Sequence, residues 1–152
     1  GGSISAAMIP IILFAVRWGA GWGIVAGLAF GTLKYFLGLD SFVISWVSIV
    51  FDYTGAYAMV GLAGLFKRKA NLIPLAAAAA GAARFVVHYI SGVTVYAEWM
   101  PETFMGMTMT SPFFYSALYN GGYMLPSTLL AVVVCAALMK PLSKFLNGED
   151  LK

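Results

Sequence analysis

Residues 111–139 read SPFFYSALYNGGYMLPSTLLAVVVCAALM, a stretch without a single Asp, Glu, Lys or Arg. A helix needs roughly 20 consecutive apolar residues to cross the hydrocarbon core of a bilayer. This stretch exceeds that length, and the basic residue Lys140 followed by Pro141 ends it. It therefore predicts a transmembrane helix and makes the chain a membrane protein.

The composition of the chain indicates the same class. Of its 152 residues, 61% are hydrophobic and 10% are charged, whereas soluble domains average about 25% charged residues. The single cysteine, Cys135, excludes a disulfide framework. A net charge of +3 spread along the chain is too small for a nucleic-acid surface. We therefore expect no nucleic-acid partner, and a lipid bilayer as the surroundings of this protein.

Charged residues and turn residues divide the chain into five apolar segments. They span residues 4–16, 22–37, 41–66, 71–96 and 111–139. The last three are long enough to cross a bilayer, whereas the first two are short and are interpreted as tilted or partly buried helices. The sequence thus predicts one integral membrane domain over residues 1–152, an all-α compact bundle of five transmembrane helices.

The joints between these segments alternate in charge. Basic joints hold Arg17, the cluster Lys67-Arg68-Lys69 and the pair Lys140/Lys144, and acidic joints hold Asp40, Glu98 and Glu102. Because basic residues are enriched in cytoplasmic loops, we expect the 67–69 loop and the C-terminus to be cytoplasmic and residue 1 to lie outside. Such an N-terminus has no evident export signal. We therefore expect a missing upstream helix and six helices in the complete protein, placed in the cell membrane.

Ionisable residues at membrane depth are costly and usually mark a site. Here they are Lys34, Asp52, Arg84 and His88. Asp52 lies near the middle of its otherwise uncharged segment, so we expect it to line a site. Lys34 lies about one turn from the outer end of its segment, and the simpler interpretation is that its side chain extends to the lipid headgroups.

Four residues of the fourth segment recur at intervals of four and therefore share one helical face. They are Arg84, His88, Gly92 and Tyr96. Gly92 would leave room for a flat molecule to approach the helix between His88 and Tyr96. The alternative is structural: Arg84 pairs with Asp52, and His88 is a core histidine with satisfied hydrogen bonds.

The last segment adds aromatic and amide groups near its outer end, in Tyr115 and Asn120. An amide at this depth needs hydrogen-bond partners. Together with Asp52, His88 and Tyr96, these residues predict one outward-facing pocket. A carboxylate, an imidazole, an amide and aromatic rings suit a small, flat, cationic heteroaromatic molecule.

Two further patterns concern packing and access. Gly19, Gly23, Gly27 and Gly31 recur at intervals of four and predict close helix packing. The Met-rich stretch 98–110 is interpreted as a flexible lid, with Trp99 bordering the pocket.

Several chemical signatures are absent from the sequence. It has no Gly-rich phosphate-binding loop, so nothing in it indicates an ATPase. It has no group of His and Cys residues with metal-ligand spacing. Its single histidine, His88, has no nucleophile in a recognisable pairing. We therefore expect a protein that is not an enzyme and that has neither a metal site nor a cofactor.

Four stretches of the sequence carry a family resemblance. They are Met8-Ile9-Pro10 leading to Arg17-Trp18-Gly19, Asp52-Tyr53 with Gly61-Leu62-Ala63-Gly64-Leu65-Phe66, RFVVHYISGV at 84–93, and Tyr115-Ser116 with Tyr119-Asn120-Gly121. In order and spacing, the chain resembles the thiamin-specific substrate-binding subunits (S-components) of energy-coupling-factor (ECF) vitamin transporters over essentially its whole length.

This resemblance implies a six-helix protein that binds thiamin from outside with high affinity and releases it inside. It implies as partners an ECF transmembrane coupling protein and two cytoplasmic ATPase subunits. The ligand-binding residues that it implies are Asp52, Tyr53, His88, Gly92, Tyr96, Tyr115 and Asn120, with Arg84 and Trp99 as further candidates.

Two alternatives stay open at this point. One is an S-component for another small vitamin or for a thiamin precursor, which keeps the pocket and changes its ligand. The other is a non-transporting structural subunit of a membrane complex, in which the polar residues tie helices together. The second alternative predicts no small ligand.

Overall fold

The computed structural model describes residues 2–38 and 43–151 of the chain. Its α-helices are α1 (Met8–Trp18), α2 (Ala20–Phe36), α3 (Trp46–Ser48), α4 (Ala56–Val60), α5 (Ile73–Thr94), α6 (Pro112–Met139) and α7 (Ser143–Leu146). A π-helical turn (Ile49–Gly55) joins α3 to α4, and 3-10 turns cover Gly61–Phe66, Ala70–Leu72, Ala97–Trp99 and Glu149–Leu151. Strands β1 (Thr103–Phe104) and β2 (Met107–Thr108) form an antiparallel hairpin.

Three helical stretches in the described part of the chain are long and apolar enough to cross a membrane: Trp46–Phe66, Ala70–Thr94 and Pro112–Met139. α1 and α2 are shorter, as expected for the first two apolar segments. The predicted helical membrane bundle is therefore confirmed, with one small hairpin added. Some positions named in the sequence analysis lie outside the described residues. They are residue 1, Asp40, and residue 41, where the third predicted segment begins.

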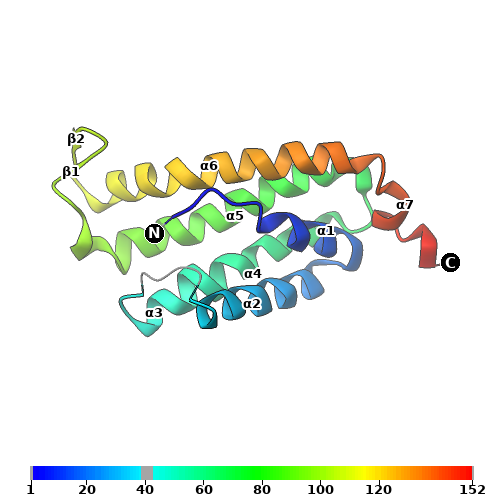
Figure 1. Ribbon diagram of the computed structural model, residues 1–152, viewed down its shortest axis with the longest axis horizontal. Helices are drawn as coiled ribbons and strands as arrows, with labels where there is room; N and C mark the ends of the chain where they lie inside the picture. The colour runs from blue at the N-terminus through cyan, green and yellow to red at the C-terminus, as the bar shows by residue number, and fades with distance from the viewer. Residues whose placement is uncertain (1, 39–42, 152) are drawn as a thin grey trace.

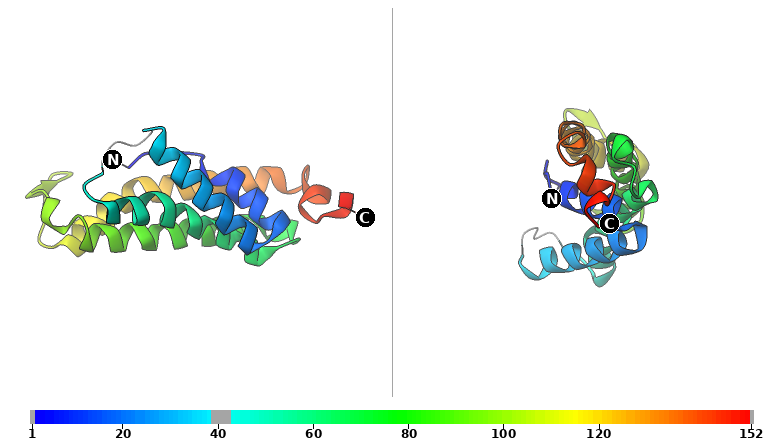
Figure 2. Two further views of the ribbon diagram at one scale, coloured as in Figure 1. Left: turned by 90° about the horizontal axis from the view of Figure 1, so that it is seen from below. Right: turned by 90° about the vertical axis from the view of Figure 1, so that its right-hand side faces the viewer.

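α5 and α6 lie side by side along the length of the molecule, and α2 and α4 form a second pair (Figure 1). α1 lies between the two pairs (Figure 2). Its residues Met8, Ile12 and Val16 recur at intervals of four and have no exposed surface. Gly19, whose φ is +103°, forms the turn from α1 into α2 instead of extending the predicted glycine stripe.

Glycines let α2 approach the Trp46–Phe66 stretch closely. A Cβ atom at Gly27 would overlap the carbonyl group of Tyr57, and one at Gly31 would overlap the carbonyl group of Tyr53. Gly23 is buried in the same contact. The prediction that this stripe serves helix packing is confirmed within the chain itself, because backbone meets backbone at each of these positions.

We expect Gly27→Ala to lower the free energy of unfolding by about 1–3 kcal/mol, because the added methyl group overpacks a rigid contact. Its Cβ would lie 2.9 Å from Ala58 Cα as well as against the carbonyl of Tyr57. Gly21→Ala is the matched control in the same helix, since a Cβ there meets nothing within 4 Å. Thermal unfolding in detergent measures both variants, and equal melting temperatures would contradict this account of the packing.

Arg17 holds the C-terminal segment against the end of α1. Its guanidinium donates to both carboxylate oxygens of Asp150, at 2.9 and 2.8 Å, and to the carbonyl oxygen of Phe145. It also lies over the Phe145 ring, with 3.8 Å between Cζ and the ring centroid. The hydrogen bonds from Arg17 lower the pKa of the Asp150 carboxyl below its ordinary value. The segment that follows α6 is thus tied to the bundle.

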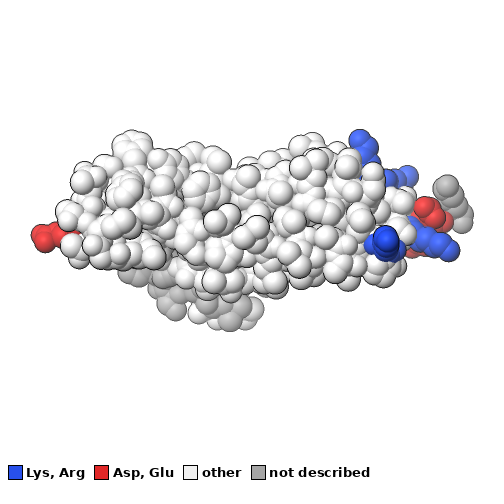
Figure 3. Space-filling model, turned by 90° about the horizontal axis from the view of Figure 1, so that it is seen from above, with Lys and Arg blue, Asp and Glu red and all other residues white. Residues whose placement is uncertain are grey.

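On one long face of the molecule, charged side chains gather at the two ends. On the face shown in Figure 3, Lys and Arg cluster at the end that carries α7, and acidic side chains mark the opposite, hairpin end. The long surface between the ends shows no charge on this face. An uncharged middle with a basic end is the pattern expected of a multi-pass membrane protein.

The Met-rich stretch 98–110, which was expected to be a flexible lid, contains the hairpin of β1 and β2. Met105 and Gly106 have φ values of +53° and +77° and form the tight two-residue turn between β1 and β2. Phe104 packs on the rings of Tyr115 and Tyr119, with centroid distances of 5.4 and 5.9 Å. Positive φ at both central residues matches the twist of a two-stranded hairpin, and the contacts of Phe104 place this hairpin against α6.

A candidate ligand-binding pocket

A cavity of about 310 Å³ lies in the half of the bundle nearer the hairpin. This volume is within the range of pockets that enclose small organic ligands. The structure brings together in this one cavity every residue that was predicted to bind a ligand. These residues are Asp52, Tyr53, Arg84, His88, Gly92, Tyr96, Trp99, Tyr115 and Asn120.

Asp52 is placed by the π-helical turn Ile49–Gly55. In this turn the N–H group of Ala56 bonds to the carbonyl of Phe51, five residues earlier. Asp52 lies in the first third of the helical stretch Trp46–Phe66, because this stretch begins five residues after the start of the predicted segment. π-helical turns of this kind are rare and are frequent at functional sites.

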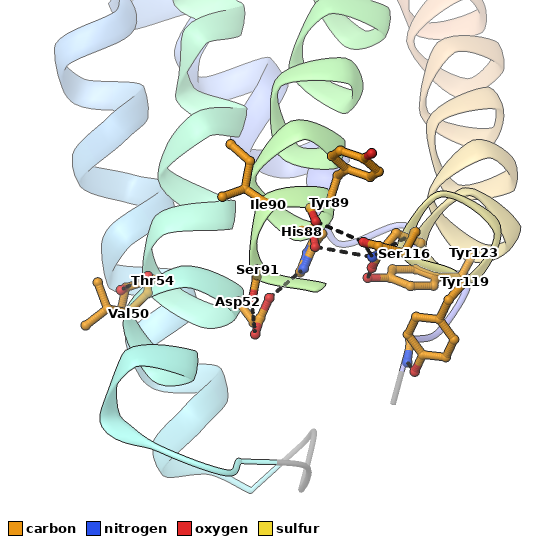
Figure 4. A network of polar contacts seen from close by, with 12 residues as sticks. Val50, Asp52, Thr54, His88, Tyr89, Ile90, Ser91, Ser116, Tyr119 and Tyr123 are labelled. Atoms are coloured by element: carbon orange, nitrogen blue, oxygen red, sulfur yellow. Dashed lines mark hydrogen bonds and ion pairs between the residues drawn. The ribbon is translucent and has the colours of Figure 1, made fainter. Parts of the chain in front are cut away.

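The carboxylate of Asp52 accepts hydrogen bonds from two side chains of α5. His88 Nδ1 lies 3.1 Å from Oδ1, and Ser91 Oγ donates to Oδ2 at 3.0 Å (Figure 4). His88 Nε2 is buried and has no hydrogen-bond partner among the residues that the structure describes. Since buried polar atoms are rarely left unpaired, this nitrogen marks a position where a ligand group would be received.

Arg84 does not pair with Asp52, contrary to the structural alternative. Its Cζ lies 4.2 Å from the centroid of the Tyr57 ring, a cation–π contact. Lys34 donates from Nζ to the hydroxyl of the same tyrosine at 3.2 Å. The expectation that Lys34 extends to the lipid headgroups is therefore wrong, because its side chain lines the pocket.

Asn120 joins α6 to α5 through its side-chain amide. Nδ2 donates to the carbonyl oxygen of His88 at 3.2 Å and to Oγ of Ser116 at 3.0 Å. Oδ1 accepts from the hydroxyl of Tyr123 at 2.7 Å. The expectation that this amide finds partners is confirmed, and these partners fix the backbone beside His88.

Gly92 and Tyr96 differ from the predicted helical stripe. A Cβ at Gly92 would overlap Ser116 Oγ and lie 3.2 Å from Asn120 Nδ2, so the space above this glycine is taken by α6. Gly92 thus serves the contact between α5 and α6 as well as lining the pocket. α5 ends at Thr94, and Tyr96 enters the pocket from the turn that follows.

Aromatic rings form one wall of the pocket along α6. The centroids of Tyr115 and Tyr119 are 5.6 Å apart, and those of Tyr119 and Tyr123 are 5.8 Å apart. Tyr123 also meets the His88 ring edge-on at 5.9 Å. Such a row of rings offers stacking and cation–π contacts to a flat, positively charged ligand.

Several lining residues were not predicted as site residues. They are Gly2, Ser3, Ser5, Lys34, Tyr57, Ser116, Tyr119 and Tyr123. The spacing of Tyr119 and Tyr123 by four residues was a usable signal, since it puts them on one face. For residues 2–5 the sequence holds no such signal. Of the stretch 98–110 that was expected to cover the pocket, only Trp99 is among the described lining residues.

Comparisons with known proteins give a consistent result. A model of the family described as Thiamine transporter protein (Thia_YuaJ) matches residues 1–147. Thiamine transporter ThiT of Bacillus subtilis (strain 168) is 30% identical over 162 aligned positions, covering 98% of this chain and 81% of that protein. The protein of the same name from Lacticaseibacillus paracasei is 29% identical and covers 95% and 77%. A solved structure of ThiT from Listeria monocytogenes has the same fold, with a TM-score of 0.81, 22% identity and coverage of 95% and 82%.

Proposed function

The chain belongs to the thiamine transporter protein family, and from this premise we propose that its pocket binds thiamin and that the chain is the substrate-binding subunit of a vitamin uptake transporter. The observation that carries the proposal is that the family match covers the whole site. The matched region is 1–147, and the described lining residues lie between Gly2 and Tyr123. The expectation of a membrane transporter protein rather than an enzyme is confirmed by the same family match.

The chemistry of the pocket supports thiamin as the ligand. Thiamin joins an aminopyrimidine ring to a positively charged thiazolium ring. The Asp52–His88 pair offers carboxylate oxygens and the unpartnered Nε2 to the nitrogen atoms of the aminopyrimidine. Rings such as Tyr115 and Tyr119 offer faces to both heterocycles.

The energy for uptake comes, in this proposal, from partner subunits. The sequence has no phosphate-binding loop for ATP. The resemblance to ECF S-components supplies the partners, a transmembrane coupling protein and two cytoplasmic ATPases. The basic end of the bundle, with the 67–69 loop and the C-terminus, faces the cytoplasm, and the hairpin end with the pocket faces outward.

Tryptophan fluorescence of the detergent-purified protein, titrated with thiamin, tests the proposal. Trp99 lines the pocket, so a bound aromatic ligand should quench its emission. We expect saturable quenching by thiamin and none by riboflavin or biotin. Absence of a saturable response from folded protein would overturn thiamin binding, and saturation by riboflavin instead would reassign the ligand.

A further inference from the structure

A groove opens at the basic end of the bundle, apart from the ligand pocket. It lies between the end of α6, the short helix α7 and Ala70, the first residue of a 3-10 turn, and its volume is about 460 Å³. Met139 and Ala70 give it apolar walls, and Lys140 and Ser143 give it an ammonium group and a hydroxyl. It shares no described lining residue with the ligand pocket, so it is a separate candidate site.

Two hydrogen-bond donors of this groove are not used within the protein. Lys140 is exposed, and neither its ammonium group nor the hydroxyl of Ser143 bonds to another residue in the described part of the chain. Asn147 is occupied instead, because its Oδ1 accepts from the backbone N–H of Ala70 at 3.0 Å and ties the two sides of the groove together. Phosphate oxygens accept hydrogen bonds from ammonium and hydroxyl donors. The groove therefore suits a phosphate group.

The surroundings of the groove are positively charged (Figure 3). Among the described residues of this end, the exposed acidic side chains are Glu149 and Asp150, and Asp150 is paired with Arg17 at 2.8 Å. The exposed basic side chains are Lys67, Arg68, Lys69, Lys140 and Lys144. Each Lys or Arg near an anionic membrane surface adds to the attraction between the protein and that surface. A negatively charged ligand is thus favoured over a zwitterionic one.

An exposed apolar stripe of α6 leads to Lys140. Leu129 and Val133 are 56% and 64% exposed, and the exposed Ala136 and Ala137 follow at the spacing of one helical turn. The separation of Leu129 and Lys140 in the sequence corresponds to about 16 Å along a helix axis. This length is close to half of the hydrocarbon core, which is roughly 30 Å thick. The stripe therefore has the length of the acyl chains in one leaflet and ends at the groove.

We propose that this groove binds the phosphate of an anionic phospholipid, held by Lys140 and Ser143, while an acyl chain of the lipid lies along the apolar stripe of α6. A free phosphate ion would use the polar groups alone, and the stripe that ends at Lys140 favours a lipid. The lipid belongs to the inner leaflet, because the proposed orientation places the basic end at the cytoplasmic side. The inference does not depend on which ligand the pocket takes.

Native mass spectrometry of the detergent-purified chain tests this inference, with phosphatidylglycerol and phosphatidylcholine of identical acyl chains as probes. We expect the wild type to bind phosphatidylglycerol more tightly. Lys140→Gln should raise the Kd of phosphatidylglycerol by about tenfold, because a charge-assisted hydrogen bond to the phosphate is lost. Lys144→Gln is the matched control, since it removes the same charge from an exposed position of α7 that is not among the described groove residues. It should change this Kd by less than about twofold.

The control variant and a competition experiment separate the alternatives. An equal loss of affinity in Lys140→Gln and Lys144→Gln would overturn the site, because it shows diffuse attraction to the basic end. Equal Kd values for the two lipids in the wild type would overturn the preference for anionic lipid. Displacement of phosphatidylglycerol by inorganic phosphate at constant ionic strength would make a free ion the occupant. If the folded protein retains neither lipid, the lipid site is refuted and the basic surface is left for an acidic protein partner, while thiamin titration of the same sample tests the proposed function separately.

Discussion

Asp52→Asn is expected to weaken thiamin binding by about 100-fold while the bundle stays folded. The substitution keeps the shape of the side chain and removes the charge that faces His88 Nδ1 and Ser91 Oγ. Truncating one partner of a buried, hydrogen-bonded charge pair costs about 2–5 kcal/mol of binding free energy. Since each 1.4 kcal/mol is a factor of ten, a 100-fold loss lies within this range.

Two measurements on the same preparation separate the possible roles of Asp52. Thiamin titration gives the Kd, and thermal unfolding without ligand gives the stability. Asp150→Asn is the matched control, because it removes a carboxylate at the opposite end of the bundle. Unchanged affinity together with a large drop in melting temperature would make Asp52 an interhelical tie and favour a structural subunit.

Several polar residues that line the pocket could be predicted from the sequence, because burying such side chains in a membrane costs free energy. Asp52 and His88 stand out in apolar segments where ionisable groups cost free energy, and the structure pairs them directly. Asn120 stood out for the same reason and has the expected hydrogen-bond partners. The long apolar segments likewise predicted the three spanning helices.

Other features depend on backbone geometry that the sequence pattern does not encode. A regular α-helix turns 100° per residue, so Asp52 and Tyr57 would point in different directions. The π-helical turn after Ser48 changes this phase and brings both residues into one pocket. Lys34 was misassigned because spacing gives the depth of a lysine but not the direction of its long side chain.

The glycine stripe of α2 connects packing with the pocket. Gly27 and Gly31 lie against the carbonyl groups of Tyr57 and Tyr53, and both tyrosines line the pocket. The close approach also brings Lys34, three residues after Gly31, within reach of the Tyr57 hydroxyl. The glycine stripe was predicted to serve packing alone. It also sets the positions of Tyr53, Tyr57 and Lys34, which line the pocket.

Asn120→Ala is expected to lower both the stability of the bundle and its affinity for thiamin. Removal of the amide leaves the carbonyl of His88 without this donor and the hydroxyl of Tyr123 without its acceptor. Interhelical hydrogen bonds in membrane proteins average about 0.6 kcal/mol and reach about 1.7 kcal/mol. Because the interhelical bond to the His88 carbonyl is lost and the buried Tyr123 hydroxyl loses its acceptor, we expect a loss of about 2 kcal/mol in the free energy of unfolding.

The affinity for thiamin should fall by about tenfold, because the backbone beside His88 and the ring of Tyr123 lose their fixed positions. Asn71→Ala is the matched control, since Asn71 is exposed in the 3-10 turn that precedes α5. Thermal unfolding and thiamin titration measure the two effects separately. A stability loss with unchanged affinity would restrict Asn120 to helix packing, whereas a loss of affinity at unchanged stability would place the amide in direct contact with the ligand.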